Sequence, residues 1–293
     1  MKFFHFRERN LPKGIILVLI AWLCFSTLWA LSKVMETQTT VPTMIFFRSV
    51  VGIILVLPWV IKRWPKSLKI NNKRVVFIRS IVGLVNLVFI LLAVQQISIV
   101  NTTLLNNSAP FFVPFLLVIF FKTPIQHKLW PAIALGFIGV FLVLHPDERI
   151  FNWGAIYGLL SGICLATMIV TMRITTHSET LVSFLLYFFL IGLVAVAPFA
   201  ILNWKVESMM TLVGLLSMGL LSLIGQIFLF HGLKFGKAHE LAPFSYSTVI
   251  FAGLFDWFLW GNIPEAIAYL GMALIIAGGL WIAYIGRFPR KVD

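Results

Sequence analysis

The sequence repeats itself with an offset of 140 residues. When residues 14–64 are aligned with residues 154–204, eleven positions are identical, among them glycine, proline, cysteine and tryptophan pairs. Apolar bias alone matches these residue types less easily than leucine or valine. Each copy carries five apolar stretches, and a repeat with an odd number of spans enters a membrane from opposite sides in its two copies. Inverted repeats of this kind are typical of secondary transporters, in which two alternately open gates surround one central site.

The composition excludes a soluble globular protein, because 60% of the residues are hydrophobic, 11% are charged and the mean hydropathy is +0.99. A membrane-spanning helix needs about 20 apolar residues. Candidate spans lie at residues 14–33, 42–61, 75–95, 101–121, 130–145, 152–172, 179–201, 210–233, 240–260 and 264–286. The predicted fold class is therefore an all-α integral membrane protein with ten transmembrane helices, arranged as two inverted five-helix repeats. We expect residues 1–148 to form the first repeat and residues 149–293 the second.

The basic residues alternate between the two sides of the predicted spans. Nineteen lysines and arginines fall on one side, and only Lys33, Arg149 and Lys205 fall on the other. Because positive charges are enriched in cytoplasmic loops, both termini are predicted to be cytoplasmic. The apolar run that starts at Gly14 belongs to the repeat, so we expect it to remain as a helix and not to be cleaved as a signal peptide.

Polar residues gather at matched positions of the predicted spans. At the same offset, residues 106–108 (Asn-Asn-Ser) fall on residues 246–248 (Tyr-Ser-Thr), and Asn86 falls on Gln226. Polar groups are costly in hydrocarbon unless they face protein or water, so they indicate a substrate pocket near the midplane. The alternative is that they only join packed helices through hydrogen bonds. The predicted substrate-binding residues are Asn86, Asn106, Asn107, Ser108, Gln226, Ser245, Tyr246 and Ser247.

Two charged residues lie within the predicted spans. Arg48 is about six residues inside the second span, roughly 9 Å deep at the helical rise, and Asp256 lies at a similar depth in the ninth. An arginine at the membrane centre costs roughly 2.5–3.5 kcal/mol on insertion scales. We predict that Arg48 and Asp256 form an ion pair on the external side, as a structural contact or as part of an outer gate. Two alternatives stay open: Arg48 binds a carboxylate or phosphate of the substrate, or its side chain reaches back to the interface.

Motifs for other classes of protein are missing. The sequence contains no GxxxxGK[ST] loop, no HExxH pair and no GxSxG elbow, and its two cysteines lack metal-ligand spacing. We therefore expect no enzyme activity, no cofactor, no metal site and no nucleic-acid partner. The expected partners are a small-molecule substrate and membrane lipids, with a homodimer left open. His231 and Glu240 are either carriers of a coupling proton or ordinary interfacial residues.

The chain resembles the drug/metabolite transporter superfamily, in particular its ten-helix branch with two EamA-type repeats. The stretches that carry the resemblance are residues 46–49 (Phe-Phe-Arg-Ser), 109–111 (Ala-Pro-Phe), 242–246 (Ala-Pro-Phe-Ser-Tyr) and the closing helix from Gly271 to Gly279. The resemblance covers roughly residues 14–286. It implies a carrier of small polar metabolites in the bacterial inner membrane, which works by alternating access around a cavity formed by the third, fourth, eighth and ninth helices.

The resemblance also has a departure. Family members often carry a glutamate near the ends of the fourth and ninth helices, where this sequence has Thr123 and Asn262. This departure weakens the expectation of proton coupling. The predicted function is secondary active transport of a small polar or zwitterionic metabolite. Alternatives are uptake of S-adenosylmethionine or a nucleotide-like metabolite, a flippase for lipid-linked substrates, and a membrane subunit that does not transport. The direction of transport and the coupling ion are left open.

Overall fold

The computed structural model describes residues 10–65, 68, 70, 72–122, 127–144, 153–178, 180–235, 241–262 and 266–285. These ranges are almost entirely helical, with one isolated β-bridge between Thr39 and Val206. The helices are α1 (Leu11–Val34), α2 (Val41–Lys62), α3 (Lys73–Val94), α4 (Ile99–Asn106), α5 (Ala109–Phe121), η2 (His127–Leu129), α6 (Trp130–Leu144), α7 (Trp153–Ser178), α8 (Leu181–Leu202), α9 (Met209–Phe235), η3 (Ala242–Tyr246), α11 (Ser247–Trp260) and α12 (Ala266–Ile285). The predicted boundary between the repeats, at residues 148 and 149, lies outside the described residues.

The identical threonines of the repeat start corresponding helices. The Thr40 hydroxyl accepts a hydrogen bond from the backbone N–H of Thr43 at the start of α2, and the Thr180 hydroxyl accepts one from Ser183 at the start of α8. A side-chain acceptor at this position satisfies one of the unpaired N–H groups of the first helical turn. The repeat in the sequence is therefore visible as a repeated helix start.

The predicted fourth and ninth spans are both interrupted. The fourth is divided into α4 and α5 at Asn107 and Ser108, because Pro110 lacks an N–H group and its ring clashes with the carbonyl of Asn106 four residues earlier. The ninth consists of the short 3₁₀ helix η3 followed by α11, at the repeat-matched position. Interrupted helices leave backbone polar groups that need partners inside the protein.

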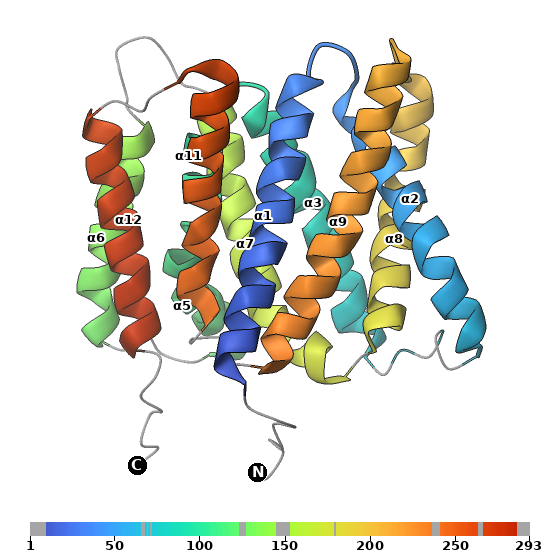
Figure 1. The fold of residues 1–293 in the computed structure, drawn as a ribbon. Helices are drawn as coiled ribbons and strands as arrows, with labels where there is room; N and C mark the ends of the chain where they lie inside the picture. Colours follow the sequence, from blue (N-terminus) through green and yellow to red (C-terminus); the bar gives the residue numbers. More distant parts are fainter. Residues whose placement is uncertain are drawn as a thin grey trace.

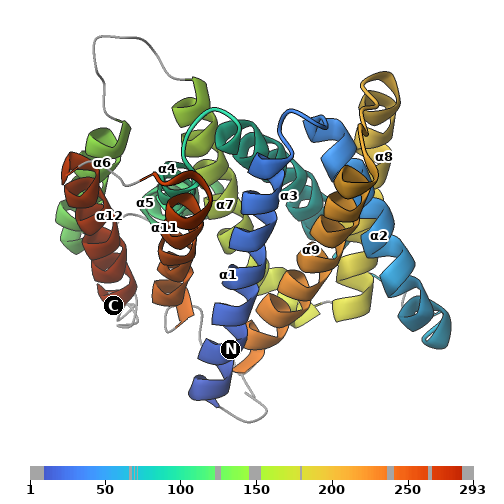
Figure 2. The same cartoon turned by 45° about the horizontal axis from the view of Figure 1, so that its top comes forward.

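The helices form two layers related by the repeat (Figures 1 and 2). Helix α1 packs along α9, and their counterparts α7 and α3 pack along each other in the same way. Three pairs join each helix to its own counterpart: α2 with α8, α4 with α11, and α6 with α12. Figure 1 shows that α1 and α7 run in opposite directions, and that α1 begins on the side of the bundle where α12 ends. These directions confirm the predicted inverted five-helix repeats.

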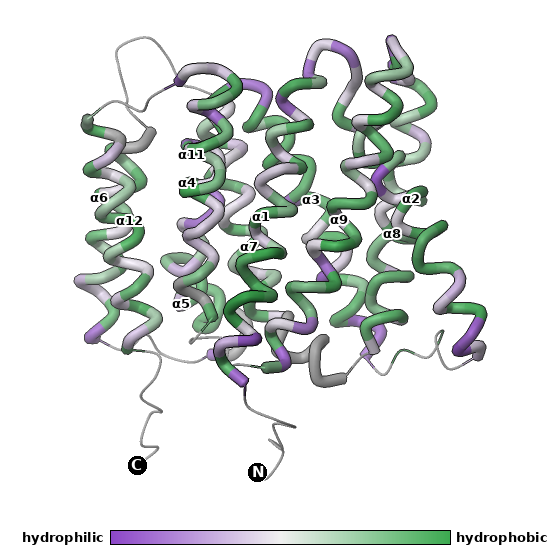
Figure 3. Tube along the Cα trace, viewed as in Figure 1, coloured by the Kyte–Doolittle hydropathy of each residue, from purple (hydrophilic) through white to green (hydrophobic). Residues whose placement is uncertain are grey.

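The outer surface is apolar, as in a protein surrounded by lipid. Seven helical segments of the described residues are long and apolar enough to cross a membrane, and α6 and α12 contain shorter apolar helices. With the η3–α11 unit they account for the ten predicted spans. Large side chains such as Ile54, Leu202 and Phe258 are exposed on this surface. Figure 3 shows hydrophobic residues along the helices and hydrophilic residues mostly toward their ends.

Glycines bring α6 and α12 into backbone contact. A Cβ atom added at Gly139 in α6 would lie 2.7 Å from the carbonyl oxygen of Gly271 in α12. One added at Gly278 in α12 would lie 2.8 Å from the carbonyl oxygen of Ala132. Any larger residue at these positions would therefore separate the two helices. The two repeats are joined tightly at this end of the molecule.

Candidate functional site

The two interrupted helices meet through buried side chains at their breaks. Asn107, at the end of α4, donates a hydrogen bond from Nδ2 to Oγ1 of Thr248 in the first turn of α11, at 2.8 Å. The same amide group donates to the carbonyl oxygen of Thr103, also at 2.8 Å. The Thr248 hydroxyl in turn donates to the carbonyl oxygen of Ser245. This contact connects the two repeats between the helix interruptions, where the sequence predicts a polar site.

A second polar cluster connects α3 and α4 to α7. Asn86 in α3 donates to the carbonyl oxygen of Ser161, and Asn106 in α4 donates to its hydroxyl oxygen, both at 3.0 Å. The close approach depends on glycines, since a Cβ at Gly158 or Gly162 of α7 would lie 2.8 Å or less from atoms of Leu105. Ser161 is absent from the predicted site. The signal in the sequence was the position of Ser161, three residues after Gly158 and one before Gly162, because glycines allow a neighbouring helix to approach closely.

We call the group formed by Asn86, Asn106, Asn107, Ser161 and Thr248 the polar seam. Four of them lie in helices, Asn107 lies at the interruption after α4, and all except Asn86 are buried. Their amide and hydroxyl groups can donate to and accept from a polar ligand once the helices separate. The seam is therefore a candidate binding site for a small molecule that carries several polar groups.

The remaining predicted residues have other surroundings. Ser108 and Ser247 donate to the carbonyl oxygens of Leu105 and Phe244, each three residues earlier, and so satisfy the backbone at the interruptions. The Tyr246 hydroxyl faces α12, where it lies against Gly279 and donates to the carbonyl oxygen of Ile275. The structure therefore does not bring Tyr246 into the polar seam. Of the other two residues, Ser245 lies before α11 and accepts the hydrogen bond of Thr248 through its carbonyl oxygen, and Gln226 is buried in α9.

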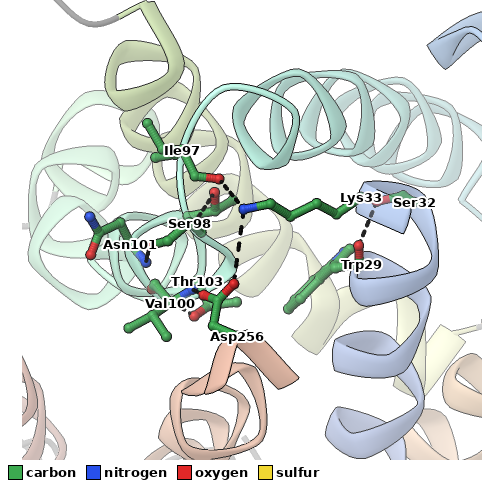
Figure 4. Close-up of polar contacts among 10 residues, drawn as sticks. Trp29, Ser32, Lys33, Ile97, Ser98, Val100, Asn101, Thr103 and Asp256 are labelled. Atoms are coloured by element: carbon green, nitrogen blue, oxygen red, sulfur yellow. Dashed lines mark hydrogen bonds and ion pairs between the residues drawn. The ribbon is translucent and has the colours of Figure 1, made fainter. Parts of the chain in front are cut away.

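A charged contact closes the space between the helix ends on the side where α1 ends and α4 begins (Figure 4). Lys33 in the last turn of α1 reaches Asp256 of α11, with 3.9 Å between Nζ and Oδ1, and donates to the carbonyl oxygen of Ile97 at 3.0 Å. The other carboxylate oxygen of Asp256 accepts a hydrogen bond from the backbone N–H of Val100 at 2.8 Å. An anion at this position also interacts favourably with the N-terminus of α4. We call these four residues the latch.

The predicted ion pair between Arg48 and Asp256 is wrong in this structure. Arg48 lies in α2, and its Nε donates to Oγ of Ser222 in α9 at 2.6 Å. Asp256 lies in α11, which packs against α1 and α4. Because α1 and α9 stand between α2 and α11, the two charges face different neighbours (Figure 2). The partner that the sequence did not reveal is Lys33, which was expected on a solvent-facing connection.

A second buried arginine was also missed. Arg79 was counted among the surface charges of one connection, but it lies inside α3 with 2% of its surface exposed. Its Nη1 donates to the carbonyl oxygen of Met168 in α7 at 2.9 Å, and its guanidinium lies 5.0 Å from the ring centre of Phe184 in α8. The position six residues after the start of α3 was the signal that Arg79 is within a span. It anchors α3 to both neighbours.

Other candidate residues carry less information. His231 is exposed near the end of α9, and Asn262 is exposed after α11, whereas Glu240 and Thr123 lie outside the described residues. Both cysteines are free thiols. Among the described residues, no three His, Cys, Asp or Glu side chains are grouped so that they could hold a metal ion.

Comparisons with known proteins agree with this architecture. The chain matches the EamA-like transporter family twice, over residues 12–145 and 152–284. The pseudopaline exporter CntI of Pseudomonas aeruginosa is 25% identical over 270 residues, which cover 91% of this chain and 94% of the exporter. The S-adenosylmethionine uptake transporter of Rickettsia felis is 24% identical over 254 residues, covering 87% of this chain and 86% of that protein. A solved crystal structure that is 16% identical superposes with a TM-score of 0.67 over 94% of this chain and 98% of its own.

The two family matches coincide with the two halves of the helical bundle. Each half contributes one interrupted helix to the polar seam, whose amide and hydroxyl groups can form hydrogen bonds with a ligand. The helical architecture, the two matches to the family and the similar proteins that align over most of the chain lead to the same conclusion. The chain is a multi-pass membrane transporter and belongs to the EamA-like transporter family.

Proposed function

We propose that the protein is a secondary active transporter of a small zwitterionic metabolite, which binds at the polar seam and crosses by alternating access. The observation that carries this proposal is the hydrogen bond between Asn107 and Thr248, at 2.8 Å. It joins the two repeats between their interrupted helices. In carriers built from inverted repeats, substrates bind near the midplane where discontinuous helices meet.

The latch supplies one of the two gates that alternating access requires. It connects α1, α4 and α11 at one end of the bundle and lies away from the helix interruptions (Figure 4). Two further contacts support the same end, since Thr40 donates to the carbonyl oxygen of Asn203 and Thr211 donates to the side chain of Gln38. Opening of this end requires these contacts to separate.

The distribution of basic residues supports an orientation. Of the nineteen lysines and arginines that the sequence assigns to one side, Arg79 is buried inside α3, and the other eighteen are assigned to the side where α1 begins and α12 ends. With this side in the cytoplasm of a bacterial cell, both termini are cytoplasmic, the protein resides in the inner membrane, and the latch is the external gate. The structure described here is then the state that is closed to the outside.

The similar proteins narrow the choice of test compounds. The Rickettsia proteins are named for S-adenosylmethionine uptake and the Pseudomonas protein for export of pseudopaline. S-adenosylmethionine, with an amino group and a carboxylate, is itself a small metabolite of the proposed chemical class. Uptake of S-adenosylmethionine is therefore the more specific second candidate.

Counterflow into liposomes that contain the purified protein would test the proposal. The vesicles are loaded with an unlabelled amino acid, nucleotide or S-adenosylmethionine, and entry of the labelled compound is measured. We expect transient accumulation of at least one compound, which unlabelled competitor abolishes and which protein-free liposomes do not show. Folded, inserted protein that accumulates none of the zwitterionic compounds would refute the proposed substrate class, and net movement of a lipid-linked compound instead would identify a flippase.

A further inference from the structure

Arg48 is a buried cation on the wall between the two layers of helices. It lies in the second turn of α2 with 6% of its surface exposed, between α8 and α9. Its guanidinium carbon is 5.2 Å from the ring centre of Phe188 and 5.6 Å from that of Phe189, and its Nε donates to Ser222. Two aromatic faces and one hydroxyl stabilise the cation, but none of them is an anion.

Of the three carboxylates among the described residues, Glu36 is exposed and the other two pair with lysines. Asp256 pairs with Lys33, and Glu207 pairs with Lys205 at 3.0 Å. No carboxylate in the described part of the chain lies within ion-pair distance of Arg48. Its outer edge, with the N–H groups of Nη1 and Nη2, forms no hydrogen bond with any residue that the structure describes. This free edge has the planar geometry that binds a carboxylate through two parallel hydrogen bonds.

The other buried arginine shows what a structural role looks like. Arg79 also lies over a phenylalanine of α8, but its outer edge is used, because Nη1 donates to the backbone of Met168. Arg48 is held instead through its Nε, which donates to the hydroxyl of Ser222. Ser222 thereby positions the guanidinium and leaves the outer edge available.

The repeat places a cation at this position in only one half of the chain. At the offset of 140 residues, its counterpart in the second half is Phe188, the residue whose ring it contacts. Arg79, whose counterpart is Gly219, is likewise present in only one half, so the available outer edge of Arg48, and not the asymmetry, distinguishes the two arginines.

We infer that Arg48 binds the carboxylate of the transported metabolite, with Ser222 as its positioning residue. This assignment rests on the proposed function and makes it more specific, because it requires a substrate that carries an anionic group. Gln226 lies one helical turn after Ser222 on the same face of α9 and can donate a further hydrogen bond to the same group.

The test compares compounds that differ only in the carboxylate. The probes are S-adenosylmethionine with its decarboxylated form and methionine with methioninamide, each used to inhibit counterflow of the labelled compound that the wild-type protein accumulates. We expect loss of the carboxylate to weaken inhibition at least about tenfold in the wild type, as for loss of a hydrogen-bonded charged group. In Arg48→Gln, the concentrations of the two members of a pair that give half-maximal inhibition should differ by no more than about twofold. Arg79→Gln, the matched control, should keep the wild-type discrimination.

Several outcomes overturn the inference. If the wild type transports a compound without discriminating within either pair, Arg48 does not bind a carboxylate although the proposed function stands; this measurement needs no variant to fold. Discrimination that persists in Arg48→Gln has the same consequence. Accumulation of no zwitterionic compound by the wild type refutes the proposed function itself. If the effect of Arg48→Gln appears only in liposomes with phosphatidylglycerol and not in phosphatidylcholine alone, the anion belongs to a lipid headgroup.

Discussion

The latch predicts a strong energetic coupling between two residues of different repeats. At 3.9 Å between Nζ of Lys33 and Oδ1 of Asp256, two unit charges attract by about 4 kcal/mol at an effective dielectric constant of about 20. Little water screens this pair, because the side chains are 13% and 1% exposed. Lys33→Met leaves a buried carboxylate without its cation and should cost about 3–5 kcal/mol of stability.

The opposite substitution should cost less. In Asp256→Asn the amide oxygen still accepts from the N–H of Val100, and Lys33 still donates to the carbonyl oxygen of Ile97. We expect a loss of about 1–3 kcal/mol. In the double variant neither charge remains, so its loss should fall below the sum of the two single losses by about 2–4 kcal/mol.

The coupling can be measured by denaturant titration of the wild type, both single variants and the double variant in mixed detergent micelles. The exposed pair Lys205–Glu207 is a matched control: its distance is shorter, 3.0 Å, but its side chains are 43% and 51% exposed. Its coupling should stay below about 1 kcal/mol. Additive losses for Lys33 and Asp256, within about 0.5 kcal/mol, would refute the assignment of the latch as an ion pair.

Two further predictions concern the polar seam and the α6–α12 contact. Asn107→Ala removes the hydrogen bond between the repeats and should lower the initial counterflow rate at least about tenfold. Ser108→Ala removes only a local hydrogen bond, and its rate should stay within about threefold of the wild-type rate. Equal effects of the two substitutions would contradict the role of the seam. Gly139→Ala places its Cβ 2.7 Å from the carbonyl oxygen of Gly271 and should destabilise the protein by about 1–3 kcal/mol in the same titration. Gly253→Ala, whose Cβ meets its nearest atom at 3.7 Å, should be neutral or stabilising by up to about 1 kcal/mol, so a similar loss at both glycines would argue against close helix contact.

The fold could be predicted from the sequence because it depends on properties that recur along the chain. Helix number follows from apolar stretches of sufficient length, and the inverted arrangement follows from a repeat with five spans. The matched polar positions, residues 106–108 and 246–248, lie where the structure interrupts the two helices, although the sequence predicted continuous spans there. The seam contact between Asn107 and Thr248 lies within these two stretches.

Side-chain partners were less accessible to prediction. The sequence gives the depth of Arg48 and Asp256 in the membrane but not the direction in which each helix faces, and their helices turned out to have different neighbours. Tyr246 illustrates the same difficulty, because the break before α11 turns its ring toward α12. Arg79 was missed for a different reason: a charge near the start of a helix was counted with the connection before it, although it is buried among α7 and α8.

The helix pairs at the two ends of the molecule have a mechanical consequence. The α6–α12 pair and the α2–α8 pair each join one repeat to the other, and they lie at opposite ends of the row of helices in Figure 2. A line through these two contacts defines a rotation axis that runs through the bundle between its layers. We expect rotation about this axis to displace each residue in proportion to its distance from the axis. The latch at the helix ends should therefore move farthest, and the polar seam near the midplane should move least. Distances between spin labels on the two layers, measured with and without a transported compound, should therefore change with opposite sign on the two faces of the membrane.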